Sequence, residues 1–138
     1  MTVYIDTSVC VSLFIDDVHS TRVKAWFRTD PEVALSRWTM AEFSSALARL
    51  RRQAIINGQQ HESAEMAFDQ WVNFLGPPIA LTDGALIYVR DLCRENGAIR
   101  TPDAVHIVLS SHARLPLATL DNLQSEVAKR YGVDVIDL

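Results

Sequence analysis

Short apolar runs alternate along this chain with longer stretches in which apolar residues recur every three or four positions. The short runs are typical of strands buried on both faces, whereas the longer recurrence is typical of helices packed on one side. We expect strands at residues 3–5, 33–36, 117–120 and 133–136, with a further short strand at 79–81. We expect helices at residues 9–14, 20–28, 39–56, 62–75, 83–96 and 123–131, and one that opens at 101–103.

The order of these elements predicts the fold class. Strands that alternate with helices form a parallel sheet that is covered by helices on both faces. No repeat, low-complexity tract or long linker interrupts this order, and 138 residues suit one domain with a core of its own. We therefore expect an α/β fold and a single domain over residues 1–138.

Capping residues indicate where the helices begin and end. Asn57 with Gly58 predicts the end of the long helix, and Gly97 predicts the C-cap of the helix at 83–96. Asp83 is expected to be the N-cap of that same helix. Thr101 is expected to cap the helix that follows it, because a proline and an acid come directly after it.

Four carboxylates lie where predicted strands lead into predicted helices: Asp6, Glu42, Asp103 and Asp121. In an open parallel sheet, ligands bind in the crevice at the carboxyl ends of the strands, so we expect these side chains to converge there. Four acids held close together repel one another unless a positive charge lies between them. Oxygen-only ligand sets suit Mg²⁺ or Mn²⁺, and a divalent cation that faces a polyanion is typical of phosphodiester hydrolysis.

Each acid taken alone also has a purely structural interpretation. Asp6 suits a helix N-cap, and Asp121 suits a turn before a cap. Glu42 and Asp103 suit the first turn of a helix, where an acid interacts favourably with the helix dipole. The metal-site hypothesis depends on the coincidence of all four at one level of the sheet. His106 follows Asp103 by three residues and could approach a metal, but we prefer packing in the core as its role.

The composition favours a soluble protein of the cytoplasm. Hydrophobic residues make up 49% and charged residues 22% of the chain, which is ordinary for a globular protein. No apolar run approaches the ~20 residues that span a bilayer, and the start MTVYIDTSV lacks the basic region of a signal peptide. Cys10 and Cys93 lie in apolar helical patterns, so we expect buried free thiols rather than a disulfide.

The net charge of −4 weighs against a nucleic-acid partner without excluding one. The four junction acids alone account for a charge of −4, so the rest of the chain has no net charge. Basic residues are clustered in two runs: Arg22, Lys24 and Arg28, and Arg49, Arg51 and Arg52. Arg100 is the better candidate for a phosphate contact, because it directly precedes the helix that carries Asp103.

Four motifs occur in a characteristic order: Tyr4-Ile5-Asp6-Thr7-Ser8, Ala41-Glu42-Phe43, Thr101-Pro102-Asp103-Ala104-Val105-His106 and Leu117-Ala118-Thr119-Leu120-Asp121. Over essentially the whole chain, this order resembles the PIN-domain family, and most of all its VapC-type toxins from bacterial and archaeal toxin–antitoxin pairs. The resemblance implies a three-layer α/β/α sandwich and a Mg²⁺- or Mn²⁺-dependent endoribonuclease. It also implies a homodimer that a small cognate antitoxin neutralises.

The resemblance assigns roles to individual residues. The acidic quartet of the family, which binds metal and supports catalysis, matches Asp6, Glu42, Asp103 and Asp121. Thr7 or Ser8 matches a hydroxyl that supports the first carboxylate, and Thr119 matches a small polar residue at the end of the strand before Asp121. The chain departs from the family at Leu123 and Gln124, where many relatives have an acid followed by an aromatic residue.

Two other classes of protein offer rival interpretations. A phosphotransfer domain also has an aspartate after its first strand, but Ser8 stands where the aspartyl-phosphate hydrolases need a second one. The stronger alternative is an inactive PIN-like domain that binds metal, RNA or a protein partner. The intact quartet favours the nuclease, because a purely structural domain has no use for four clustered acids. A small reading frame directly upstream would support the antitoxin.

Overall fold

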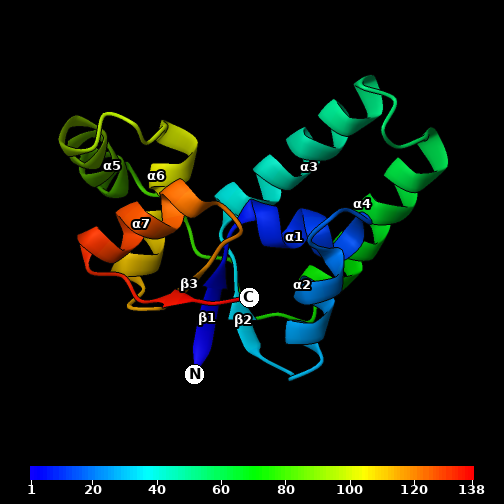
Figure 1. Ribbon diagram of the computed structural model, residues 1–138, viewed down its shortest axis with the longest axis horizontal. Coiled ribbons are helices and arrows are strands. Elements are labelled where there is room, and N and C mark those ends of the chain that lie inside the picture. Colours follow the sequence, from blue (N-terminus) through cyan, green and yellow to red (C-terminus); the bar gives the residue numbers. More distant parts are fainter.

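The computed structural model describes all residues from Met1 to Leu138 and shows a parallel sheet between two groups of helices (Figure 1). The strands are β1 (Thr2–Ile5), β2 (Glu32–Ala34), β3 (Leu117–Ala118) and β4 (Val135–Ile136). The helices are α1 (Thr7–Phe14), α2 (Ser20–Phe27), α3 (Arg37–Arg52), α4 (Gly58–Val72), α5 (Asp83–Glu95), α6 (Thr101–His112) and α7 (Asn122–Tyr131). The predicted α/β/α sandwich around a parallel sheet is therefore confirmed.

Strand β1 lies inside the sheet, with neighbours on both sides. The strand order is β2-β1-β3-β4, and every neighbouring pair is parallel. Tyr4 pairs with Ala34 on one side and with Leu117 on the other. Because successive side chains of a strand point to opposite faces, Val3 and Ile5 pack in one apolar cluster and Tyr4 packs in the other. The carboxyl end of β1 therefore lies in the middle of the sheet edge.

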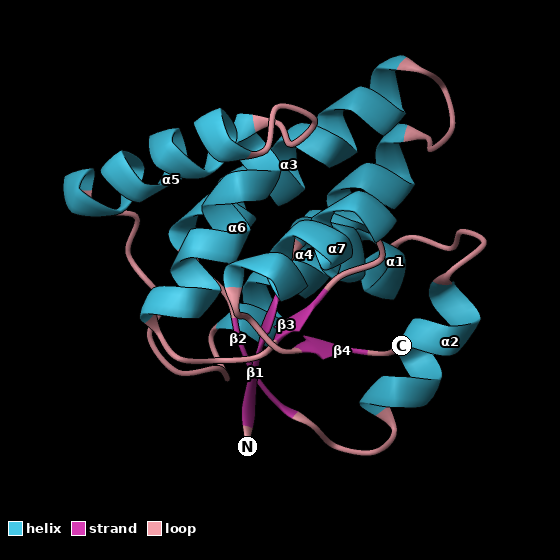
Figure 2. Cartoon of the chain, turned by 60° about the vertical axis from the view of Figure 1, so that its left-hand side comes forward, coloured by secondary structure: helices cyan, strands magenta, loops and turns pink.

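The two faces of the sheet are covered by separate groups of helices. Helices α1–α4 lie on one side and α5–α7 on the other, as Figure 1 shows. Figure 2 shows the same helices and strands from a second direction, in which α7 overlaps α1 and α4. Phe43 of α3 stacks on Phe68 of α4 with ring centroids 3.9 Å apart, and Phe14 of α1 packs edge-on against both. This aromatic cluster fixes α3 against α1 and α4.

Asn57 begins a helix, and the prediction that it ends one is wrong. Helix α3 ends at Arg52, and α4 begins at Gly58 rather than at residue 62. The Asn57 side chain accepts a hydrogen bond from the Gln60 backbone N–H at 2.8 Å, and the Gln60 side chain accepts one from the Asn57 N–H at 2.8 Å. This reciprocal capping box satisfies two donors at the start of a helix.

Three other predicted caps are also wrong. Thr82, not Asp83, caps α5, because its side chain accepts a hydrogen bond from the Ala85 N–H at 3.1 Å. The N-cap of α6 is Arg100, which makes no side-chain capping bond, so Thr101 is already helical. Helix α5 ends at Glu95 with Asn96, not Gly97, as its C-cap, and the only glycine with positive φ is Gly132 behind α7.

The sheet is shorter than the apolar runs suggest. Residues 79–81 form no strand, and only Ile79 makes an isolated parallel bridge, to Ser36. Strand β3 ends at Ala118, so Thr119 and Leu120 lie in the turn that leads to α7. Apolar character at these positions reflects burial of the connecting segments rather than further strand pairing.

The predictions for the two cysteines and for membrane-spanning segments can be checked against the structure. Both cysteines are free thiols, and Cys10 is buried as expected, whereas Cys93 is only partly buried. No helix combines the length and the apolar character that crossing a bilayer requires.

We predict that the Phe43–Phe68 stack is a main determinant of stability. Phe43→Ala should lower the free energy of unfolding by about 3–5 kcal/mol, because a fully buried ring is lost and a cavity remains. Phe74→Ala is the matched control, because Phe74 is 88% exposed, and its change should stay within about 0.5 kcal/mol. Urea unfolding followed by circular dichroism measures both, and equal midpoints would contradict the prediction.

Candidate functional site

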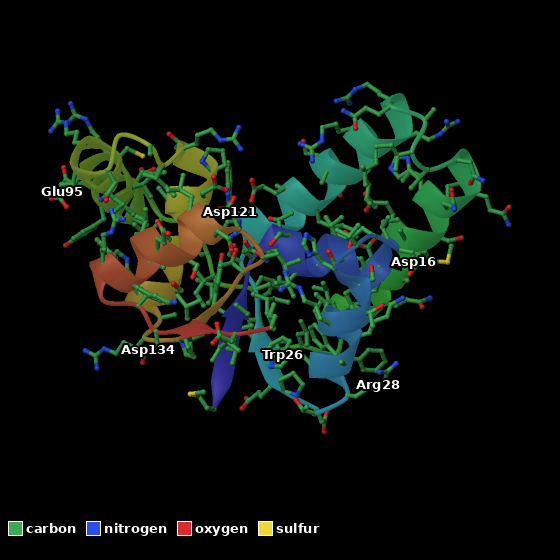
Figure 3. All side chains as sticks on the ribbon, viewed as in Figure 1. Asp16, Trp26, Arg28, Glu95, Asp121 and Asp134 are labelled. Atoms are coloured by element: carbon green, nitrogen blue, oxygen red, sulfur yellow. The ribbon has the colours of Figure 1, made fainter.

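The four junction acids lie at the end of the sheet opposite to the N-terminus. Asp6 follows β1 and caps α1, and Asp121 comes shortly after β3 and caps α7. Asp103 lies in the first turn of α6. Glu42 lies in the second turn of α3, because the helix begins at Arg37, so the expected first-turn position is wrong. Figure 3 labels Asp121 where the strands lead into the helices.

Three of the four acids share one cleft, and the fourth is buried. A cleft of about 500 Å³ is lined by Glu42, Asp103 and Asp121 together with Thr7, Ser8, Arg49 and Arg100. Asp6 does not line this cleft and is only 3% exposed. Its connection to the cleft runs through the adjacent Ser8. The site therefore has an accessible acidic wall and one acid held inside the protein.

Asp6 is surrounded by hydrogen-bond donors. Its Oδ1 accepts from Ser8 Oγ at 2.6 Å and from the Val9 backbone N–H at 3.1 Å, and its Oδ2 lies 2.6 Å from Thr119 Oγ1. Burial raises the pKa of the Asp6 carboxyl above its ordinary value, although nearby His106 and these hydrogen bonds act in the opposite direction. Of the two hydroxyls that the resemblance offers for this carboxylate, it is Ser8 that contacts Asp6.

Gln124 is a site residue that the sequence interpretation missed. Its amide Nε2 donates to the Asp103 carbonyl at 3.0 Å, which turns its Oε1 towards Thr119 Oγ1 at 2.6 Å. Thr119 therefore has two acceptors close by, Asp6 and Gln124, but only one hydroxyl hydrogen. Thr119 can therefore donate to Asp6 or to Gln124, but not to both at once. The departure from the family at this position therefore places a buried amide beneath the site.

Glu42 is held in place through a single oxygen. Its Oε1 accepts from Thr7 Oγ1 at 2.7 Å and from His106 Nε2 at 2.5 Å. Burial would raise the pKa of Glu42, but His106, Thr7 and Arg100 together lower it below its usual value. His106 is 2% exposed, so the preferred core location is found, together with a direct contact to a site acid.

Asp103 and Asp121 are close enough to influence each other. Burial raises the pKa of Asp103, and the Asp121 carboxylate raises it further, while Arg100 opposes both. Arg100 Nε lies 3.9 Å from Asp103 Oδ2, and Asp121 Oδ1 accepts from the Gln124 N–H at 2.8 Å. As they stand, no three acidic, histidine or cysteine side chains are close enough together to form a ready-made metal site. The fold thus gathers the acids without closing them around one point.

The opposite pKa shifts of Asp6 and Glu42 predict opposite effects of neutral variants. In metal-free buffer at neutral pH, Asp6→Asn should raise the free energy of unfolding by about 1–3 kcal/mol, because the amide removes a buried charge and donates to Thr119. Glu42→Gln should lower it, since the native surroundings favour the carboxylate.

The pH dependence of stability should show the same signs. Because the folded pKa of Asp6 is raised, its contribution is present at low pH and is lost as pH rises through that pKa. Because the folded pKa of Glu42 is lowered, its contribution is present above the unfolded pKa and is lost as pH falls through the folded one. Thermal melts of both variants with EDTA at several pH values test this, and a destabilised Asp6→Asn would contradict it.

Solved structures with the same fold include proteins of several bacteria. FitAcB from Neisseria gonorrhoeae has a TM-score of 0.75 and 21% identity, over 99% of this chain and 97% of that one. VapBC2 from Rickettsia felis, bound to a DNA fragment from its promoter, has a TM-score of 0.70 and 15% identity, over 100% and 99%. VapBC-5 from Mycobacterium tuberculosis, of the VapBC family of toxin–antitoxin systems, has a TM-score of 0.64 and 19% identity, over 99% and 98%.

The sequence itself also matches a family profile. No curated protein is similar enough in sequence to count as a match. The profile of the family described as PIN domain matches residues 3–130, which include all four junction acids, β2, β3 and all of β1 but its first residue. At the low identities above, the solved structures support the fold alone, whereas the profile covers most of the sequence. The chain therefore belongs to the PIN domain family.

Proposed function

We propose that this protein is a Mg²⁺- or Mn²⁺-dependent endoribonuclease, and the toxin of a cytoplasmic toxin–antitoxin pair. The observation that carries the proposal is the cleft at the strand ends, where the carboxylates of Glu42, Asp103 and Asp121 lie beside Arg49 and Arg100. Acids that hold a cation and arginines that contact phosphates are the two groups that phosphodiester hydrolysis requires. Asp6, buried behind this wall, completes the quartet.

The donor set fits a hard divalent cation. Carboxylate oxygens are the ligands that Mg²⁺ and Mn²⁺ prefer, and Asp121 and Glu42 both raise the pKa of Asp103, so a positive charge would relieve their repulsion. In this proposal Asp6, Glu42 and Asp103 hold the main ion, directly or through water, and Asp121 binds it more weakly or holds a second ion. A bound divalent cation supplies a water of lowered pKa and stabilises charge on the phosphate.

The protein's own residues orient the reacting groups. Thr7 holds Glu42, and Ser8 and Thr119 hold Asp6, so the ligands are preorganised by hydroxyls on α1 and after β3. Arg100 carries an exposed side chain at the rim of the cleft, where it would contact an RNA phosphate. No serine or histidine nucleophile is needed in this scheme.

Two adjoining pockets suggest how the antitoxin would bind. The cleft extends from the acids past Arg49 to Ile55, where it meets an apolar pocket of about 420 Å³ between the end of α1 and α4. That pocket is lined by Phe14, Ile56 and Ala64 among others. An antitoxin segment would place apolar side chains there and an arginine against the carboxylates, where charge-assisted pairing would displace the cation. VapBC-5, which has the same fold, belongs to a family of toxin–antitoxin systems.

The proposal also includes a homodimer, which is expected from the resemblance to VapC-type toxins. Helix α5 exposes three large apolar side chains, Leu86, Ile87 and Tyr88, which a second copy would shield from water.

Cleavage of RNA by the purified, antitoxin-free protein is the direct test. With Mg²⁺ or Mn²⁺, total cellular RNA should yield discrete fragments, and EDTA should prevent this. Asp6→Asn and Asp103→Asn should each slow cleavage by more than about 100-fold, because even partners of metal ligands contribute about 10–100-fold. Asp69→Asn is the control, since Asp69 is exposed on α4 outside the cleft, and it should cleave normally.

The outcomes of this test are distinct. Wild-type cleavage by Asp6→Asn would show that the quartet is not the active site. No cleavage with either metal, by folded protein, would favour a PIN-like domain that only binds its partners.

We predict that Arg100 contacts one RNA phosphate. In the inactive Asp6→Asn background, Arg100→Ala should weaken the binding of labelled single-stranded RNA and reduce the slope of log affinity against log salt by about 0.7. Arg28→Ala is the control, because Arg28 is exposed at the end of α2 and Figure 3 shows it far from Asp121. Fluorescence anisotropy at several salt concentrations gives both slopes, and an unchanged slope for Arg100→Ala would refute the contact.

A further inference from the structure

A chain of buried polar groups reaches the site from inside the protein. Tyr4 Oη lies 2.8 Å from Ser36 Oγ and 2.8 Å from His106 Nδ1. His106 Nε2 lies 2.5 Å from Glu42 Oε1. Tyr4, Ser36 and His106 are all almost completely buried. The chain therefore joins β1, the start of α3 and α6 to one carboxylate at the edge of the cleft.

The direction of each hydrogen bond follows from what its partners are able to donate. A Glu42 carboxylate only accepts hydrogen bonds, so His106 Nε2 carries the hydrogen between the two groups. With its hydrogen on Nε2, the ring has a lone pair on Nδ1, so the Tyr4 hydroxyl donates to Nδ1. Ser36 Oγ accepts from the Thr39 N–H at 3.0 Å and donates to the Tyr4 oxygen. Every hydrogen in the chain then has an acceptor, although Thr39 Oγ1 also lies 3.1 Å from Ser36 Oγ and Thr7 Oγ1 lies 3.3 Å from His106 Nε2.

This arrangement constrains Glu42 in a specific way. Both of its donors, Thr7 and His106, bind the same oxygen, Oε1. The other oxygen, Oε2, has no protein donor, while the residue lines the cleft. Since both ring nitrogens of His106 are already occupied by Glu42 and Tyr4, the histidine is not available as a metal ligand itself. The hydrogen bond from His106 Nε2 instead fixes the orientation of the Glu42 carboxylate.

We propose that His106 is the positioning residue for Glu42, and that Tyr4 holds its ring so that Glu42 Oε2 is presented to a divalent cation. The inference rests on the proposed function, because it assumes that Glu42 is a metal ligand. Groups that orient a ligand from behind typically contribute about 10–100-fold to metal affinity. A histidine that merely fills the core would contribute to stability but not to the affinity of the folded protein for metal.

The test compares Mn²⁺ affinity among variants at position 106. Mn²⁺ alone is added to the metal-free protein, and free Mn²⁺ is measured by electron paramagnetic resonance. His106→Leu should weaken binding by about 10–100-fold. His106→Gln should stay within a few-fold of wild type, because its amide nitrogen replaces Nε2, whereas His106→Asn places its nitrogen near Nδ1 and should fail. His112→Gln, on the exposed end of the same helix, is the control.

Tyr4→Phe tests the contribution of Tyr4 separately from that of His106. It removes the hydrogen bond to Nδ1 and keeps most of the buried ring, so it should weaken Mn²⁺ binding less than His106→Leu. Nitrogen-15 spectra of the metal-free wild type should show His106 with its hydrogen on Nε2. Melting curves establish that each variant is folded at the temperature of the binding measurement.

The outcomes distinguish a failure of this inference from a failure of the proposed function. If His106→Leu binds Mn²⁺ as tightly as wild type, or if the Gln and Asn variants weaken it equally, His106 is only a core residue. A hydrogen on Nδ1 alone would also overturn the inference, and in these cases the proposed function is unaffected. If the wild type binds no Mn²⁺, the proposed metal site fails and the inference fails with it.

Discussion

The arrangement of the site depends on keeping the side chain of Asp6 inside the protein at the end of β1. A buried carboxylate is costly unless hydrogen bonds replace its water, and Ser8, the Val9 N–H and Thr119 provide them from two segments of the chain. Thr119 is itself fixed by Gln124, which reaches across to α6. Parallel pairing of β1 with β3 brings these donors together. The apolar clusters on the two faces of the sheet then hold that pairing.

The main features of the fold and the location of the acids were predictable because their signals are local. Alternating apolar runs and helical periods specify a parallel sheet, and parallel strands necessarily end at one edge. Asp6 and Asp121 each follow an apolar segment and cap the next helix, so a local structural role and the proposed metal-binding role fall on the same side chains. In this fold a helix cap is also a means of placing a carboxylate at the edge of the cleft.

The remaining features were missed for identifiable reasons. Asn57 followed by Gly58 resembles a helix end, but the reciprocal Gln60 three residues after Asn57 is the signature of a helix start and could have been recognised. The contact between Tyr4 and His106 spans 102 residues, and no local pattern announces it. Gln124 was noticed only as the absence of a family residue. Its role depends on the position of the Asp103 carbonyl, which only the folded structure provides.

The distance along the chain between Asp6 and Thr119 affects how the protein is made. The two residues are 113 positions apart, yet they share a hydrogen bond, and β1 pairs with β3 just before Thr119. Translation adds roughly 5–20 residues per second, so β1 leaves the ribosome several seconds before β3 exists. Until then Asp6 has Ser8 and Val9 but neither β3 nor the Thr119 hydroxyl. A nascent or prematurely terminated chain would therefore carry the first acid of the site without the enclosure that orients it.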